Sequence, residues 1–359
     1  MGSILLVGCV GCSDPETMAT SPSAIFSPVA TVGQLAPGQP IEAAVNHPTY
    51  FSITDEFVIV GDNADPRPKL FSLDGTYSHT AGDAGNGPGE LGRPTSALEV
   101  DGELWVFDSE TSRVSAFDVD TGQYLRSGVQ PFAFVRATSS SRSSAVVLNL
   151  ALREGAPEAP SLVHVLNPED FSVRTSFGNA RSLWTERFSP DLLLLDPGRF
   201  CTWGNGGVAY APALFWGEVF RFNQHGETSD SGVERIPIPV GIPPSVEVAS
   251  LLGVSEARGI VCGENGAFTL YLARSSAGGP KALEVFSVTD AGVVEKSGRL
   301  HGVVFPETEY WDYRVTIQGT SGDTLALLDA DQHGDPRLRV GTISWSDKSP
   351  AAQLTSPGA

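Results

Sequence analysis

Short apolar runs recur along the chain, and glycine, proline or Asp-Gly turns separate them. The chain holds 39 glycines and 26 prolines, and its longest stretch free of both runs from Phe132 to Glu154. Inside a helix, glycine and proline cost about 1 and 3 kcal/mol each, so this spacing excludes a helix bundle or a coiled coil. Apolar residues make up 41% of the chain, which is enough for a core. The sequence therefore predicts an all-β fold.

The clearest unit runs from Leu98 to Leu125, where Asp101-Gly102 separates two apolar runs and predicts a hairpin. An apolar strand of this kind recurs, and we expect each copy to be an inner strand: Phe57–Val60, Leu104–Phe107, Val146–Asn149, Val208–Tyr210, Phe268–Tyr271 and Leu325–Leu328. A partner strand follows each of them: Lys69–Gly75, Arg113–Asp118, Leu162–Leu166, Val219–Asn223, Leu283–Val288 and Leu338–Ile343.

This repetition predicts a six-bladed β-propeller of four-stranded antiparallel blades, because such units bury their faces only by stacking on one another. Residues Ile25 to Gln34 precede the first unit and are expected to add a strand to the last blade, closing the ring. The alternative is a pair of β-sandwich domains. The expected boundaries are a signal-peptide-like segment (1–12), a flexible tether (13–24), the propeller (25–348) and a disordered tail (349–359).

A family resemblance rests on the segment from Gly82 to Asp118. Its glycine-rich turn and the strands after it resemble the NHL-type six-bladed β-propeller family, which is common in bacterial envelopes. The matching positions are Gly85, Gly87, Pro88, Gly89, Glu90, Leu91, Pro94, Val100, Asp101, Trp105, Val106, Asp108, Arg113 and Phe117. The resemblance implies the same fold, and it says little about function.

The N-terminus resembles the end of a bacterial signal peptide. Leu6-Val7-Gly8-Cys9 is similar to a lipobox, so Cys9 is the first candidate for lipidation and Cys12 the second. A signal peptide should begin with Lys or Arg, and none occurs before Arg67. Either the start codon lies further upstream or this segment is an ordinary apolar N-terminus. The export hypothesis predicts a lipoprotein of the bacterial cell envelope, periplasmic or associated with the outer membrane.

Two further cysteines, Cys201 and Cys262, each lie beside glycines near a predicted strand. In an exported protein such a pair can form a disulfide, and two buried free thiols are an equal alternative. The four cysteines lack the paired CxxC…CxxC pattern, so a structural zinc site is not expected.

Net charge is −19, and no Lys/Arg cluster is visible. Nucleic acid is therefore not an expected partner, and contact with a membrane is expected only through the lipid anchor.

The segment Gly82–Pro94 invites a phosphate-loop interpretation, but neither Gly-Lys-Ser/Thr nor a helix start follows it. We expect it to be a crossover between blades. Asp62, Asp108 and Asp329 each end an apolar strand, and we expect each to cap a turn and to pair with a basic residue, such as Lys69 or Arg113. Calcium ligation in a central channel is the alternative role for these aspartates.

The six histidines show no HxH or HExxH spacing, and no Gly-x-Ser-x-Gly motif occurs. No catalytic, cofactor-binding or metal-binding residue is predicted. Among aromatic residues near loops, Trp216 and Trp311 are the candidates for a recognition patch, with packing between blades as the alternative.

We therefore expect a binding or assembly module, with a protein partner or a small ligand at the channel mouth. The alternative is a propeller hydrolase or lyase that uses a metal in the central channel.

Overall fold

The computed structural model describes residues 22–35, 37–132, 137–141, 144–148, 161–179, 198–204, 206–215, 217–222, 233–240, 255–274, 282–305, 315–320 and 323–346. Within these ranges the chain forms β-strands and one short 3₁₀ helix, η1 (Ile41–Ala43). The predicted all-β class is confirmed. No helix in the described part is long and apolar enough to cross a membrane.

Four antiparallel sheets contain four strands each. Group 1 is β2 (Pro48–Ile53), β3 (Phe57–Asp62), β4 (Asp65–Ser72) and β5 (Tyr77–Thr80). Group 2 is β8 (Pro94–Val100), β9 (Glu103–Asp108), β10 (Arg113–Asp118) and β11 (Tyr124–Val129). Group 3 is β12 (Ala137–Ser141), β13 (Ser144–Leu148), β14 (Ser161–Leu166) and β15 (Val173–Asn179). Group 4 is β16 (Arg199–Trp203), β17 (Gly207–Ala211), β19 (Glu218–Phe222) and β20 (Val233–Pro237).

A nine-stranded sheet contains two more antiparallel runs of four strands. Group 5 is β21 (Ser255–Cys262), β22 (Phe268–Arg274), β23 (Ala282–Val288) and β24 (Val294–His301). Group 6 is β25 (Thr316–Gly319), β26 (Thr324–Ala330), β27 (Pro336–Ser346) and the N-terminal β1 (Ser23–Val32). The ninth strand, β18 (Leu214–Phe215), pairs with the start of β21.

Strand β1 joins the two ends of the chain. It pairs with β27 in antiparallel fashion, from Ser23 opposite Ser346 to Val32 opposite Leu338. Its first three residues also pair in parallel with Arg299 to His301 of β24, which fuses groups 5 and 6 into one sheet. The expectation that this segment adds a strand to the last group is confirmed.

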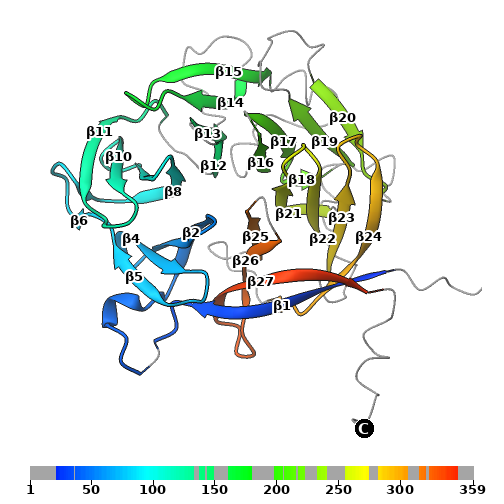
Figure 1. The fold of residues 1–359 in the computed structure, drawn as a ribbon, viewed down its shortest axis with the longest axis horizontal. Helices are drawn as coiled ribbons and strands as arrows, with labels where there is room; N and C mark the ends of the chain where they lie inside the picture. Colours follow the sequence, from blue (N-terminus) through cyan, green and yellow to red (C-terminus); the bar gives the residue numbers. More distant parts are fainter. Residues whose placement is uncertain are drawn as a thin grey trace, which may run out of the picture.

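The groups are arranged around a common centre (Figure 1). The first strands of successive groups contact one another in cyclic order, β2 with β8, β8 with β12, β12 with β16, β16 with β21, β21 with β25, and β25 with β2. The apolar strands that the sequence predicted to be the inner ones are the second strands, one place further out. The search for apolar runs did not identify the innermost strands because they are less apolar, as in the Ala-Thr-Ser-Ser-Ser sequence of β12.

The core lies between the groups. Among the described residues, six clusters of buried apolar side chains each join two successive groups: groups 1 and 2 (Ile59 with Leu104), 2 and 3 (Phe107 with Leu166), 3 and 4 (Val163 with Tyr210), 4 and 5 (Val219 with Leu270), 5 and 6 (Tyr271 with Leu325), and 6 and 1 (Leu328 with Val58). In β9, Leu104 and Val106 face group 1, whereas Trp105 and Phe107 face group 3. Successive side chains of a strand point to opposite faces, so a strand buried on both faces needs a continuous apolar run.

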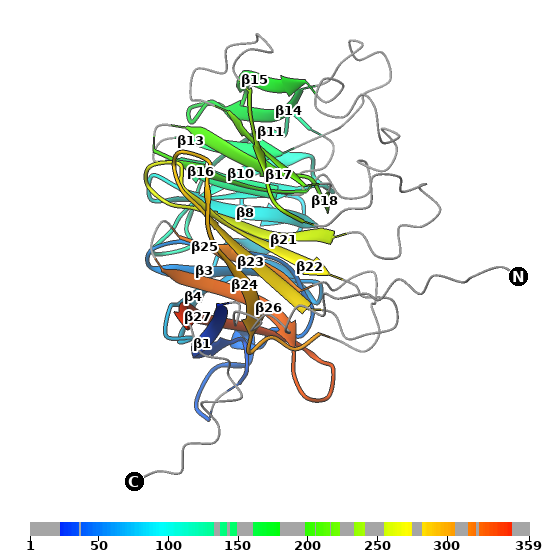
Figure 2. The ribbon, with the colours of Figure 1, turned by 90° about the vertical axis from the view of Figure 1, so that its right-hand side faces the viewer.

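In side view the strands run across the thickness of a flattened body, so their ends lie on two faces (Figure 2). Neighbouring strands within a group are antiparallel, so the turns from first to second and from third to fourth strand share one face. We call it the turn face. The turns from second to third strand and the crossovers between groups lie on the opposite face, the crossover face.

Candidate functional site

Three buried aspartates lie where the second strands of groups 1, 2 and 6 reach the crossover face. Asp62 and Asp108 are the last residues of β3 and β9, and Asp329 is the last but one of β26. The Asp108 carboxylate accepts hydrogen bonds from the backbone N–H of Gly92 (2.6 Å) and Arg93 (3.0 Å) in the incoming crossover, and from Glu110 (2.9 Å) in its own turn. The expected role as a turn cap is found here, and the carboxylate also holds the crossover to the strand end.

Asp62 repeats this arrangement, accepting from the N–H of Asn46 (2.8 Å), His47 (3.2 Å) and Ala64 (3.0 Å). The buried ammonium of Lys69 lies 3.8 Å from it. Asp329 accepts from the N–H of Val304 (3.1 Å) in the preceding crossover.

Two arginines surround Asp329. Arg337 Nε lies 3.1 Å and Arg339 Nε 3.2 Å from its carboxylate, and Arg339 is buried. Arg113 behaves differently from the prediction: it donates to the backbone carbonyls of Asn86 (2.9 Å) and Gly87 (3.3 Å) instead of pairing with Asp108. The crossover between groups 1 and 2 folds across the strand, so its carbonyl groups accept the hydrogen bonds of the Arg113 guanidinium.

Calcium ligation does not fit these aspartates. Their oxygens accept from N–H groups and guanidinium groups, whereas calcium needs several oxygens converging on one point. Within the described ranges, no group of three or more His, Cys, Asp or Glu side chains is placed to hold a metal ion.

The glycine-rich segment forms the crossover from group 1 to group 2, as predicted. Its short strands β6 (Asp83–Ala84) and β7 (Glu90–Leu91) pair in parallel. The Glu90 carboxylate accepts the Gly87 N–H at 2.7 Å, so this backbone N–H of the loop already has an acceptor within the protein. Gly89 has a φ of +79° and packs against Tyr124, which only a residue without a Cβ permits.

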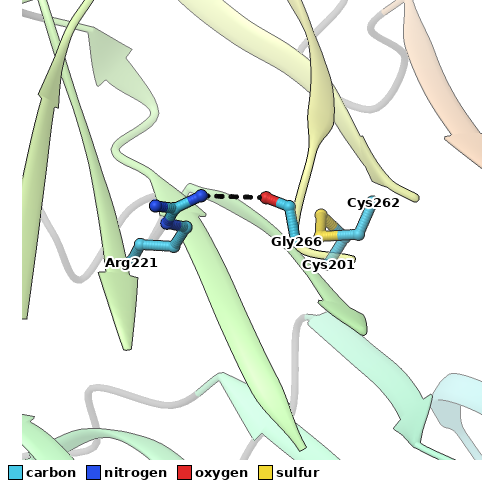
Figure 3. The surroundings of a disulfide bond; sticks show 4 residues. All are labelled: Cys201, Arg221, Cys262 and Gly266. Atoms are coloured by element: carbon cyan, nitrogen blue, oxygen red, sulfur yellow. Dashed lines mark hydrogen bonds between the residues drawn. A yellow bond between two sulfur atoms is a disulfide. The ribbon is translucent and has the colours of Figure 1, made fainter. Parts of the chain in front are cut away.

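A disulfide joins Cys201 of β16 to Cys262 of β21, with Cα atoms 5.5 Å apart, and so links the first strands of groups 4 and 5 (Figure 3). Beside it, Arg221 donates to the carbonyls of Gly266 (3.2 Å) and Asp290 (2.6 Å). Group 4 is thus attached to group 5 on the turn face by the disulfide and by the hydrogen bonds of Arg221, which reach both the β21–β22 turn and the β23–β24 turn.

The turn face is acidic. Its described turns carry Asp55, Glu56, Asp74, Asp101, Asp120, Glu169, Asp170, Glu264, Asp290 and Asp323, and none of these turns carries a Lys or Arg. Burial raises the pKa of Glu99, at the end of β8, and the nearby carboxylates of Glu56 and Asp55 raise it further, against a hydrogen bond from Thr54. Sequence reasoning missed Glu99, because its neighbours come from group 1 and a different turn.

The two residues of the predicted aromatic patch, Trp216 and Trp311, are not among those that the structure describes, and neither are Cys9 and Cys12. Phe215, next to Trp216, is fully buried in the cluster between groups 4 and 5. For Phe215, the packing alternative is therefore the correct one.

No protein-family model matches the chain, and neither does any curated protein. The NHL resemblance of the Gly82–Asp118 segment therefore has no family match behind it.

Solved structures show where the fold belongs. The chain is similar to a protein of Bacteroides fragilis named "putative exported protein", with a TM-score of 0.59 and 11% identity, over 90% of this chain and 95% of that one. It is also similar to a member of the DUF4221 family from Bacteroides vulgatus, with a TM-score of 0.54 and 9% identity, over 92% and 98% of the two chains. Both have β-propeller-like folds. The chain therefore has an all-β, β-propeller-like fold, and at this identity the likeness concerns the fold alone.

Proposed function

We propose that the chain is a six-bladed β-propeller in which each strand group is one blade. The single observation that carries this proposal is the set of six interface clusters, which join the groups in cyclic order and return from group 6 to group 1. The cyclic contacts of the first strands support the same arrangement.

The same closed core supports a binding or assembly function. Because both faces of every group pack against neighbouring groups, only the turns, the crossovers and the outermost strands are accessible to other molecules. Propellers commonly use such surfaces as rigid platforms, because loops on a rigid scaffold can present binding residues. The partner is a protein or a small ligand, and nucleic acid is disfavoured by the net charge of −19.

Export to the bacterial envelope completes the proposal. Support comes from the lipobox-like Leu6–Cys9 sequence, from the structural similarity to a protein named for export, and from the disulfide, a bond typical of oxidising compartments. Cys9 is the proposed lipidation site and Cys12 is the second candidate. The tether, predicted as residues 13–24, is shorter than expected, because β1 begins at Ser23 and Ala24 is buried in the core.

Metabolic labelling tests the anchor. Full-length protein, Cys9→Ala and Cys12→Ala are expressed in a bacterial host with labelled palmitate. Label is expected in the wild type and in Cys12→Ala, and not in Cys9→Ala. Label in Cys9→Ala and none in Cys12→Ala would assign lipidation to Cys12. An unlabelled wild type would contradict the proposal that the protein carries a lipid anchor.

Cross-linking in intact envelopes tests the binding function. A tagged chain is expected to be recovered with a defined partner at a reproducible ratio. Recovery of the chain alone, across several cross-linker lengths, would contradict a binding or assembly role.

A further inference from the structure

The outermost strands of groups 1 to 4 (β5, β11, β15 and β20) are each an edge of a sheet at the rim of the molecule, whereas those of groups 5 and 6 (β24 and β1) pair with each other over three residues. An edge strand presents unpaired backbone N–H and C=O groups, which can pair with an extended segment of another chain. Proteins usually block this pairing with charges, proline, short strands or a covering segment.

Most rim strands of this protein carry such protection. Strand β20 exposes Glu234 and Arg235 and ends at Pro237. Strand β24 exposes Glu295, Lys296 and Arg299 and is partly covered by β1. Three further rim strands are protected in other ways. Strand β5 is only four residues long, β1 contains Pro28 at a register shift, and β15 exposes the charged Arg174.

Strand β11 has no proline, and its only irregularity is a register shift at Leu125, between the pairs Ala116–Arg126 and Phe117–Tyr124. Its first residue, Tyr124, packs against the crossover, at Gly89. Tyr124, Leu125 and Val129 are 39%, 47% and 79% exposed, whereas each other described rim strand exposes at most one large apolar side chain. Its one charged residue, Arg126, is directed inward, where it pairs with Glu103, donates to the Pro168 carbonyl (2.7 Å) and lies 5.2 Å from the Phe171 ring centre. The exposed side chains of β11 are therefore mainly apolar, with Ser127 between them, and its one charge, the 35% exposed Arg126, is paired with Glu103.

The fold already contains one short strand pairing at its rim, because the first three residues of β1 pair in parallel with the last three of β24. The geometry of a rim strand in this protein is therefore compatible with a further strand. Among the described residues, β11 has no partner on its outer side.

The charges around β11 select the partner. Asp118 ends β10, and Asp120 lies in the turn that precedes β11. The backbone of Asp170, next to Glu169, lies against Gly128. A second copy of this chain would bring another acidic surface and a further net charge of −19. A segment flanked by Lys or Arg would instead be attracted.

We propose that β11 is a docking edge that binds an extended, basic segment of a partner protein by strand addition. This inference rests on the proposed binding function and names the surface and the class of partner. Backbone pairing supplies the contact, Leu125 and Val129 select apolar side chains at alternate positions, and the acidic turns select flanking basic residues.

The test uses the full-length protein and a synthetic peptide, Lys-Lys-Thr-Val-Thr-Val-Thr-Lys-Lys. Hydrogen exchange of wild-type protein should slow at the amides of residues 124–129 when the peptide is added. A Leu125→Lys/Val129→Lys double variant should weaken peptide binding by about tenfold or more. The matched control is Val293→Lys, which changes a similarly exposed valine (59%) in a turn of group 5.

The proposal would be overturned if the peptide slowed hydrogen exchange at strands other than β11, or if it slowed no exchange at saturating concentration. Equal binding of a peptide with Glu in place of each Lys would also overturn it. A concentration-dependent dimer of the wild type that the double variant abolishes would assign the edge to a second copy, and would also overturn it. Thermal unfolding of the variants shows that they fold, and the exchange measurement needs no variant. If these tests fail while envelope cross-linking still yields a partner, the binding function stands and only the β11 assignment falls.

Discussion

Asp62, Asp108 and Asp329 occupy the same place in three strand groups, and each connects a strand end to a crossover through backbone N–H donors. The carboxylates are buried, so each hydrogen bond forms away from water. Removing such an acceptor leaves several N–H groups unsatisfied, and this cost exceeds the net value of the bonds themselves.

We expect Asp108→Ala to lower the free energy of unfolding by about 3 kcal/mol, because it leaves the N–H groups of Gly92, Arg93 and Glu110 without an acceptor. Urea unfolding measures the change. Asp55→Ala, at an exposed turn, is the control and should leave stability nearly unchanged. Equal effects of the two substitutions would refute this role of Asp108.

Glu99 gives a pH-dependent prediction. Its pKa is raised by burial and by neighbouring carboxylates, so the folded state binds a proton more tightly than the unfolded state and pays a penalty at neutral pH. The charged carboxylate destabilises the folded protein at pH values above its folded-state pKa, and this destabilisation disappears as pH falls through that pKa. Glu99→Gln should therefore raise the melting temperature relative to wild type at pH 7.5, and the difference should shrink as pH falls toward the ordinary range for glutamate.

The measurement is thermal unfolding of both proteins across that pH range. Glu295→Gln, on the exposed part of β24, is the control and should show no such trend. A Glu99→Gln difference that grows on acidification would contradict the raised pKa.

At the scale of elements, the sequence pattern located the second and third strands well and the first strands poorly. A second strand such as β9 is buried on both faces, and its unbroken apolar run can be recognised in the sequence. A first strand such as β12 has a polar sequence that resembles a loop. The aspartate caps followed from their position after a strand, but the partner of Arg113 depended on how the crossover folds, which strand periodicity does not encode.

The disulfide is an element-scale connection between groups 4 and 5. It closes a separation of 61 residues, and in the chain-entropy account a loop of this length stabilises the fold by about 4 kcal/mol. Cys201→Ala/Cys262→Ala should lower the free energy of unfolding by an amount of that order.

Guanidinium unfolding with and without dithiothreitol measures this effect. The reductant should destabilise the wild type and leave the double variant unaffected, because the variant has no bond between these strands to lose. A wild type insensitive to full reduction, verified by thiol counting, would contradict a stabilising role.

At the scale of the whole molecule, ring closure depends on β1. Without it, β27 loses the partner that spans most of its length, and the cluster between groups 5 and 6 loses Ala24 and Phe26. Deleting residues 1–32 should therefore abolish cooperative unfolding or cause aggregation, since it also opens long strand edges.

Deletion of residues 1–21 is the matched control, because it stops before β1, and it should preserve the melting temperature. Calorimetry and size-exclusion chromatography distinguish the two cases. A cooperative, monomeric protein after the longer deletion would show that β1 is dispensable for closure.

The pairing of β1 with β27 also sets the order in which the chain can fold. Strand β1 pairs mainly with β27, which lies far along the chain, so most of its hydrogen bonds form only after β27 has been synthesised. Contacts so distant along the chain slow folding and leave intermediates exposed. A chain truncated before Pro336 offers β1 no antiparallel partner, so the N-terminal strand stays unpaired along most of its length until β27 has been synthesised.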